Sequence, residues 1–182
     1  ESEAPFRNIT VENCCISRSN RAISLQLRDK GCIENVIFSN INIDTRMFST
    51  EHWWGKAEPI AITAVRRRED TEIGYIRNVR FQNINACGEN GILIYGEETK
   101  NISNIAFENV HIRLTKKTEW PKQYHDLRPN VGNTILEDSL RVVYARNARD
   151  ISFTGFSCEI DADIAGEIDE AVSMENCCNV SL

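Results

Sequence analysis

Two polar segments of this 182-residue chain hold aromatic, basic and acidic side chains close enough in sequence to do chemistry together. In the first, residues 46–58, two adjacent tryptophans precede Lys56 and Glu58. Tryptophans are costly to expose, and loops on rigid scaffolds often carry function. One interpretation is a binding wall, in which Trp53 or Trp54 stacks on a sugar ring and Lys56 meets a carboxylate. The alternative is a hydrophobic plug on the protein's flank, with Lys56 and Glu58 paired to each other.

The second segment, residues 113–137, mixes lysines and aromatic residues with the sequence YHDLRP from Tyr124. An aromatic and basic mixture suits an anionic sugar, although the length and polarity also fit an ordinary surface loop. His125 and Asp126 suggest acid–base chemistry, but adjacent loop residues more often point apart, so we do not expect this pair to be catalytic.

Three consecutive arginines form a further basic run at residues 66–68. A solvated charge run is the commoner interpretation, and the functional one places Arg66 in bidentate contact with a carboxylate. The side chains that we expect to contact a ligand are Trp53, Trp54, Lys56, Glu58, Arg66, Tyr95, His125 and Arg128.

A sequence repeat, called a phrase below, predicts the scaffold that positions these segments. It reads RNITVENCCI from Arg7, ENVIFSNINI from Glu34, RNVRFQNINA from Arg77, SNIAFENVHI from Ser103 and RDISFTGFSC from Arg149, and a sixth copy begins at Asn179. Its leading Asn or Asp positions are 8, 35, 78, 104, 150 and 179, which gives steps of 27, 43, 26, 46 and 29 residues. Near-equal steps are typical of a repeat architecture. The two longer steps contain inserted loops, at about residues 44–58 and 113–138.

Within each phrase, apolar and polar residues alternate, an Asn interrupts, and the alternation resumes. This pattern predicts two short strands that meet at a bend, because Asn tolerates left-handed backbone angles. In a stacked structure Asn13, Asn40, Asn83 and Asn109 would form a buried ladder of side-chain amides, and Gly155 would take the same place in the fifth phrase.

A second apolar phrase follows each first one and predicts a third strand. Its copies lie at residues 21–27, 59–64, 91–95, 140–144 and 171–174. Three strands per repeat, rich in Ile and Val and without helical periodicity, predict an all-β parallel β-helix, a solenoid of about five to six coils. A β-sandwich is the alternative, but hairpin turn dipeptides are almost absent. We expect one such segment over residues 1–182 with two inserted loops.

The Asn phrases, together with HWWGKAEPIAIT from His52 and YHDLRP from Tyr124, resemble the C-terminal half of bacterial glycoside hydrolase family 28, the polygalacturonase group of the pectin-lyase-like superfamily. The resemblance covers nearly all of the chain. It implies a right-handed β-helix and an inverting hydrolysis of galacturonate- or rhamnogalacturonan-type pectin, in which one protonated carboxyl acts as general acid and others activate water.

The chain departs from this family in its catalytic motifs. The family's Asn-Thr-Asp, Asp-Asp and Gly-His-Gly motifs do not occur, and Ser24, Leu25 and Gln26 stand where its Arg-Ile-Lys is expected. The outward positions of the third strands, which would floor a cleft, contain no carboxylate; they are Ser24, Gln26, Ala61, Thr63, Leu93 and Tyr95. We therefore expect this chain to supply a cleft wall, with catalytic carboxylates on coils before Glu1. A non-catalytic carbohydrate-binding or adhesin-like module is the alternative.

Charge and hydropathy exclude some classes of binding partner. A net charge of −6 argues against nucleic acid, and no apolar run reaches the roughly 20 residues of a membrane helix. We expect an acidic plant polysaccharide or oligosaccharide as ligand and no metal or cofactor. Neither end reads as a cap, which predicts further coils or end-to-end homo-oligomers. The seven cysteines are interpreted as small buried residues rather than disulfides, and they leave a secreted, periplasmic or cytoplasmic bacterial location open.

Overall fold

The computed structural model describes residues 4–49, 54–121, 124–132, 134–137 and 139–182. Its long strands are β1 (Phe6–Ser19), β3 (Cys32–Thr45), β5 (Tyr75–Gly88) and β7 (Ile102–Leu114). The shorter strands are β2 (Ile23–Leu27), β4 (Ile60–Ala64), β6 (Ile92–Gly96), β8 (Tyr124–Asp126), β9 (Ile135–Glu137), β10 (Val143–Arg146), β11 (Arg149–Thr154), β12 (Ser157–Ile160), β13 (Val172–Glu175) and β14 (Cys178–Ser181). One 3-10 turn, η1 (Ala165–Glu167), lies between β12 and β13.

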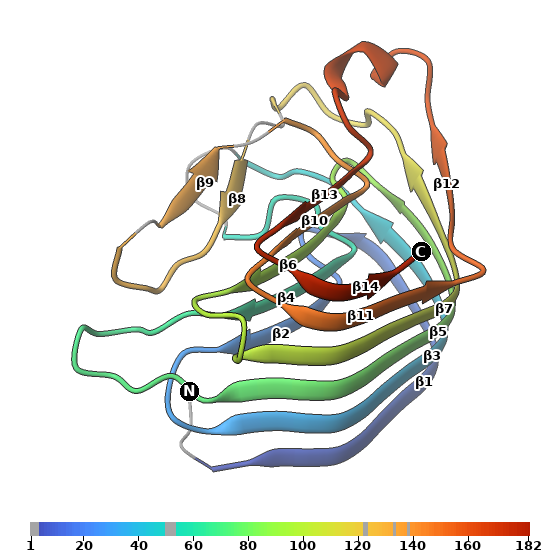
Figure 1. The fold of residues 1–182 in the computed structure, drawn as a ribbon. Helices are drawn as coiled ribbons and strands as arrows, with labels where there is room; N and C mark the ends of the chain where they lie inside the picture. Colours follow the sequence, from blue (N-terminus) through green and yellow to red (C-terminus); the bar gives the residue numbers. More distant parts are fainter. Residues whose placement is uncertain (1–3, 50–53, 122–123, 133, 138) are drawn as a thin grey trace.

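The strands form two large parallel sheets and one small antiparallel pair (Figure 1). The larger sheet has the order β1-β3-β5-β7-β11-β14, with β12 also paired to β7, and the second has the order β13-β10-β6-β4-β2. The chain passes from one sheet to the other and back, so that each pass lies beside the previous one. This all-β parallel arrangement confirms the coarse fold prediction and is compatible with a β-helix. It is not the antiparallel sandwich, since only β8 and β9 pair in that sense among the described residues.

The prediction of three separate strands per repeat was wrong for most of the chain. The two short strands expected in each first phrase are one continuous strand, 14 residues long in β1, β3 and β5. Asn40 takes a left-handed φ of 56° that bends β3 while the parallel pairing resumes on either side. Only in the last full pass does Gly155, with φ 63°, separate β11 from β12.

The predicted asparagine ladder is present. The amide Nδ2 of Asn40 donates to Asn13 Oδ1 over 3.1 Å, Asn83 donates to Asn40 over 3.1 Å, and Asn109 donates to Asn83 over 3.2 Å. The expectation that this ladder is buried was wrong, because its side chains face solvent at the outer side of the bend. The inner side of each strand is occupied by Ile, Val and Phe.

A second ladder joins the leading asparagines of the phrases, which the sequence patterning identified without predicting their bonds. Asn35 donates to Asn8 over 3.1 Å, Asn78 to Asn35 over 3.0 Å, and Asn104 to Asn78 over 2.8 Å. All four residues have left-handed φ values between 53° and 58°. Every long strand is therefore fixed at two bends by side-chain amides.

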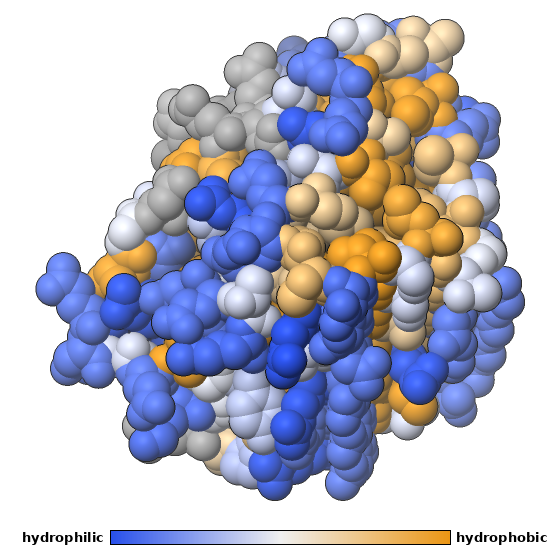
Figure 2. Space-filling model, viewed as in Figure 1, coloured by the Kyte–Doolittle hydropathy of each residue, from blue (hydrophilic) through white to orange (hydrophobic). Residues whose placement is uncertain are grey.

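The core lies between the two large sheets and is built from residues that recur at one position of each pass. Phe38, Phe81, Phe107 and Phe153 stack with centroid distances of 5.3, 4.9 and 4.9 Å. On the face of the molecule that Figure 2 shows, polar residues cover much of the surface and hydrophobic residues gather over the last strands of the chain. Val172 and Met174 of β13 are partly buried against the core.

The second insertion covers the outer face of the sheet formed by β13, β10, β6, β4 and β2. Strands β8 and β9 lie in the long connection between β7 and β10, beside that sheet in Figure 1. Leu127 and Leu136 from this connection pack on Ala61, Leu93 and Tyr144, which form a cluster separate from the main core. The part of the insertion that contains Leu127 and Leu136 therefore covers this sheet, rather than forming only a surface loop.

The cysteines are all free, and only Cys32 is buried. The prediction that they are buried was thus wrong for Cys15, Cys158 and Cys178, which are exposed, whereas Cys14 and Cys177 are partly buried against the core. Neighbouring residues of a strand face opposite sides, so Cys14 is half-buried while Cys15 is exposed. In the part of the chain that the structure describes, no helix has the length and hydropathy needed to cross a membrane.

Candidate functional site

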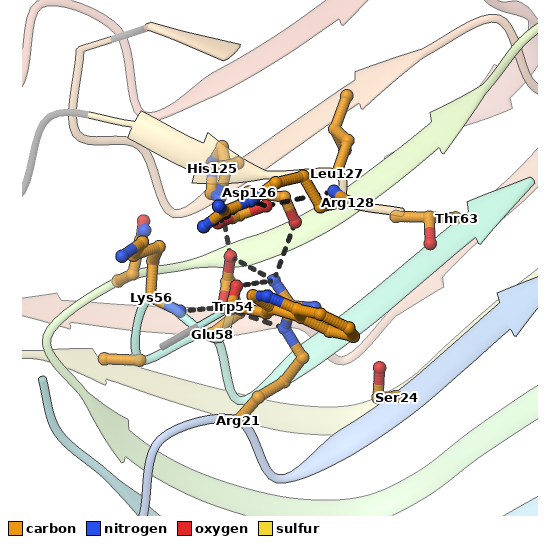
Figure 3. A network of polar contacts seen from close by, with 12 residues as sticks. Arg21, Ser24, Trp54, Lys56, Glu58, Thr63, His125, Asp126, Leu127 and Arg128 are labelled. Atoms are coloured by element: carbon orange, nitrogen blue, oxygen red, sulfur yellow. Dashed lines mark hydrogen bonds and ion pairs between the residues drawn. The ribbon is translucent and has the colours of Figure 1, made fainter. Parts of the chain in front are cut away.

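A bidentate ion pair between Arg21 and Glu58 is the centre of a polar network beside β2 (Figure 3). Arg21 precedes β2 and Glu58 precedes β4, and these parallel strands bring the two residues together. The Nε of Arg21 donates to Glu58 Oε2 over 3.0 Å, and Nη2 donates to Oε1 over 2.9 Å. Strand pairing therefore places the end of the first insertion against the preceding pass.

Glu58 has no exposed surface and accepts two further hydrogen bonds. The backbone N–H of Lys56 donates to Oε2 over 2.7 Å, and Nδ1 of His125 lies 3.0 Å from Oε1. Burial alone would raise the pKa of the Glu58 carboxyl. The charge of Arg21 and the bonds from His125 and Arg21 outweigh burial and hold this pKa well below its usual range. The carboxyl is therefore held as an anion at neutral pH.

The neighbouring carboxylate is also neutralised. Asp126 is fully buried, and its two oxygens accept bonds from Arg128 Nε, each over 3.0 Å. The Asp126 carbonyl lies 3.4 Å from Arg21 Nη2 and accepts a long hydrogen bond from it. The network thus connects the second insertion to the first through Arg21.

A second buried arginine supports the same junction. Arg28, which follows β2, donates to Thr63 Oγ1 over 3.0 Å and to the Leu127 carbonyl over 3.1 Å. Burial, with the nearby charges of Arg21 and Arg67, lowers the pKa of Arg28 to about 10. The guanidinium is still a cation at neutral pH, and it fixes the covering segment onto β4.

Trp54 presents an aromatic surface beside this network. Its residue is 50% exposed, and its carbonyl accepts a bond from Arg21 Nη2 over 3.2 Å. Figure 3 shows the indole lying next to the Arg21 side chain and extending toward the side of β2 that carries Ser24. Ser24 is exposed and accepts a hydrogen bond from Gln26 over 3.1 Å. An exposed indole on a buried polar base can stack on the apolar face of a sugar.

The remaining predicted contact residues lie in different settings. Trp53 lies outside the described residues. Lys56 is 1% exposed, so its side chain does not present a charge to solvent, and Glu58 is bound as described above. Arg66 is exposed, and its Nε forms an ion pair of 2.8 Å with Glu97. Tyr95 is half-buried beneath the guanidinium of Arg146, which lies 5.7 Å from the ring centroid.

His125 and Arg128 do lie together with Glu58, as elements of the buried network. His125 is 5% exposed, and its ring stacks on Tyr144 at a centroid distance of 6.3 Å. Arg128 is occupied by Asp126. The structure therefore brings Trp54, Lys56, Glu58, His125 and Arg128 together. Arg66 and Tyr95 lie apart from this network, where they contact Glu97 and Arg146.

Most of the expected cleft floor is covered. Ala61 and Leu93 are fully buried in a cluster with residues of the second insertion, and Thr63 is fully buried beside the Arg28 guanidinium. Ser24 and Gln26 of β2 keep exposed surface, in register with Ala61 and Thr63 of β4. The continuous floor expected across β2, β4 and β6 was therefore wrong.

Sequence reasoning missed Arg21 and Arg28 as members of the site. Both flank the apolar strand β2, and a charged residue at each end of a buried strand is the signal that could have identified them. Their partners are 37 residues away for Glu58 and 99 residues away for Leu127, which no local pattern reveals.

The arrangement is suited to binding rather than to proton transfer. A general acid needs a pKa near the working pH, whereas Glu58 is held ionised and Asp126 is ion-paired. Among the described residues, no group of three or more His, Cys, Asp or Glu side chains could hold a metal ion. No family model matches this chain, and comparisons with curated proteins and with solved structures gave no match.

Proposed function

We propose that the chain is a right-handed parallel β-helix of about five to six coils, related to glycoside hydrolase family 28. The alternation of the chain between two parallel sheets supports the solenoid, as do the two asparagine ladders. The segments around Trp54 and His125, which carry the family resemblance in sequence, both belong to the polar network.

We further propose that this chain forms the wall of a cleft that binds an acidic, pectin-type oligosaccharide or polysaccharide. The observation that carries this proposal is the half-exposed Trp54, whose backbone carbonyl is held by Arg21 of the buried Arg21–Glu58 pair. A loop whose backbone is already held loses less conformational freedom when a ligand binds. Ser24 and Gln26 beside it offer hydrogen-bonding groups for sugar hydroxyls.

In this proposal the chain supplies no acid–base pair. Both carboxylates of the network are buried and paired, and the exposed row of β2 contains none. An inverting glycosidase needs two carboxyl groups about 6.5–9.5 Å apart with room for water between them. A non-catalytic carbohydrate-binding or adhesin-like module is the second candidate, and the same pairing of Glu58 and Asp126 favours it.

The test combines binding and turnover by the 182-residue chain. Calorimetry should detect weak binding of oligogalacturonate that decreases as salt rises, because exposed charges are screened over about 8 Å at physiological ionic strength. Trp54→Ala should weaken binding by about tenfold, which corresponds to about 1.4 kcal/mol. Its free energy of unfolding should stay within about 0.5 kcal/mol of wild type. Trp120→Ala, at a half-buried tryptophan of the second insertion, is the matched control.

No reducing sugar should be released from polygalacturonate or rhamnogalacturonan between about pH 4 and 8, a range that spans the usual carboxyl and histidine pKa values. Turnover that is abolished by Glu58→Gln or Asp126→Asn would overturn the proposal of a non-catalytic cleft wall. It would place catalytic carboxylates in the buried network. An unchanged affinity in Trp54→Ala would remove the indole from the binding surface.

A further inference from the structure

A pocket of about 500 Å³ adjoins the Trp54 network, at the turn between β1 and β2. It is lined by Arg18, Ser19, Asn20, Arg21, Phe48 and Gly55, and is called the Arg18 pocket below. The volume falls within the range of small-molecule sites and is sufficient for a sugar unit. No contact that defines the function proposed above uses Arg18, Asn20 or Phe48.

The pocket is positively charged although the protein is acidic overall. Two arginines and no carboxylate line it, against a net charge of −6 for the chain. Arg21 is neutralised by Glu58, whereas the guanidinium of Arg18 makes no hydrogen bond or ion pair with any residue in the described ranges. The Asp44 carboxylate accepts a hydrogen bond from the backbone N–H of Arg18 over 3.3 Å and pairs with the ammonium of Lys117. The Arg18 side chain is therefore available to a ligand anion.

An aromatic ring and an amide complete the lining. Phe48 is 36% exposed, and the Arg46 guanidinium lies 4.5 Å from its ring centroid, which holds the ring in place. The Oδ1 atom of Asn20 is shielded from solvent and accepts no hydrogen bond from the described part of the protein. Because solvent does not reach this oxygen, it offers no hydrogen bond to a ligand, and Phe48 is the group in this part of the lining that a sugar ring could contact.

The pocket and the Trp54 indole are connected by residues that they share. Gly55, which lines the pocket, directly follows Trp54, and Arg21 both lines the pocket and donates to the Trp54 carbonyl. A Cβ at Gly55 would lie 2.8 Å from the Asn20 carbonyl oxygen, so the glycine allows the insertion to contact this turn closely. The pocket is therefore directly adjacent to Trp54.

We infer that the Arg18 pocket is a subsite for a carboxylated sugar unit, a hexuronate, of the same chain whose neighbouring unit stacks on Trp54. The carboxylate pairs with the Arg18 guanidinium in a bidentate geometry, and the ring's C–H face packs on Phe48. This inference rests on the binding function proposed above, and it assigns the preference for acidic sugars to Arg18 rather than to Lys56 or Arg66.

The experiment uses two probes, a galacturonate trisaccharide and the same trisaccharide with its carboxylates reduced to hydroxymethyl groups. Arg18→Gln should lower the affinity for the acidic probe by about tenfold and leave the neutral probe within about twofold of wild type. Glutamine keeps a long polar side chain at a position whose φ is 54°. Arg149→Gln, at an exposed arginine of β11, is the control for loss of one positive charge.

The outcomes separate the two proposals. If Trp54→Ala lowers the affinity for both probes but Arg18→Gln changes the affinity for neither, the pocket assignment is overturned and the proposed cleft wall stands. If Arg18→Gln has the expected effect and Trp54→Ala has none, the subsite remains and the indole wall is overturned. Wild-type protein that binds neither probe overturns both, and an equal loss for both probes in Arg18→Gln shows a structural role that also overturns the subsite.

Discussion

The Glu58 carboxylate joins the two insertions, because it contacts Lys56 of the first and His125 of the second as well as Arg21. Glu58→Gln would leave the buried Arg21 guanidinium without its counter-ion. We expect a loss of about 3–5 kcal/mol in the free energy of unfolding, measured by urea denaturation. Glu98→Gln, at an exposed ion pair with Lys100, should change it by less than about 0.5 kcal/mol.

The depressed pKa of Glu58 also predicts how stability depends on pH. A carboxyl whose folded pKa lies below its unfolded value, ordinarily about 4.3, contributes stability that is fully present above that value and is lost as pH falls through the folded pKa. Glu89 has a lowered pKa too, because burial, which would raise it, is outweighed by hydrogen bonds from the backbone N–H groups of Met47, Lys117 and Thr118. Wild-type stability should therefore decline from about pH 5 downward. In Glu58→Gln this decline should be shallower, and an equally steep decline in both proteins would contradict the assignment.

Among the elements, the long strands depend on a residue type that accepts left-handed angles at each bend. Asn40→Leu places a branched side chain at φ 56° and removes two ladder bonds, so we expect a loss of about 1–3 kcal/mol in unfolding experiments. Asn40→Gly should lose less, because glycine accepts this backbone. Asn42→Leu, in the same strand with only a 3.5 Å amide contact, should be nearly neutral. A cost for Asn42→Leu equal to that of Asn40→Leu would argue against the role of the bend.

The elements that sequence could predict are those that repeat. The period of the Asn phrases located the long strands and the ladder through Asn40, because each pass places the same residue type at the same angle. The burial of Thr63 could not be predicted, since it depends on a covering segment from a distant part of the chain, held there by Arg28. Likewise, the two buried arginines were missed because their partners become neighbours only through strand pairing and loop packing.

For the whole molecule, stability should depend on how many neighbouring passes enclose a core residue. Phe81 stacks between Phe38 and Phe107 and has no exposed surface, whereas Phe153 is 7% exposed at the end of the described stack. Phe81→Ala should cost about 3–5 kcal/mol in the free energy of unfolding. Phe153→Ala should cost less, because its site can relax more fully. Equal costs in denaturant unfolding would contradict this nearest-neighbour dependence.

The ladder of leading asparagines spans segments of very different length with nearly the same geometry. Asn35 reaches Asn8 across 27 residues with a bond of 3.1 Å, and Asn78 reaches Asn35 across 43 residues with a bond of 3.0 Å. The geometry of the stacked strands therefore does not depend on the length of the insertion between β3 and β4, provided that the next strands pair in the same register. Foreign sequence could therefore be grafted into that junction to create new recognition surfaces, provided that Gly55 and Glu58, which fix its returning end, are kept.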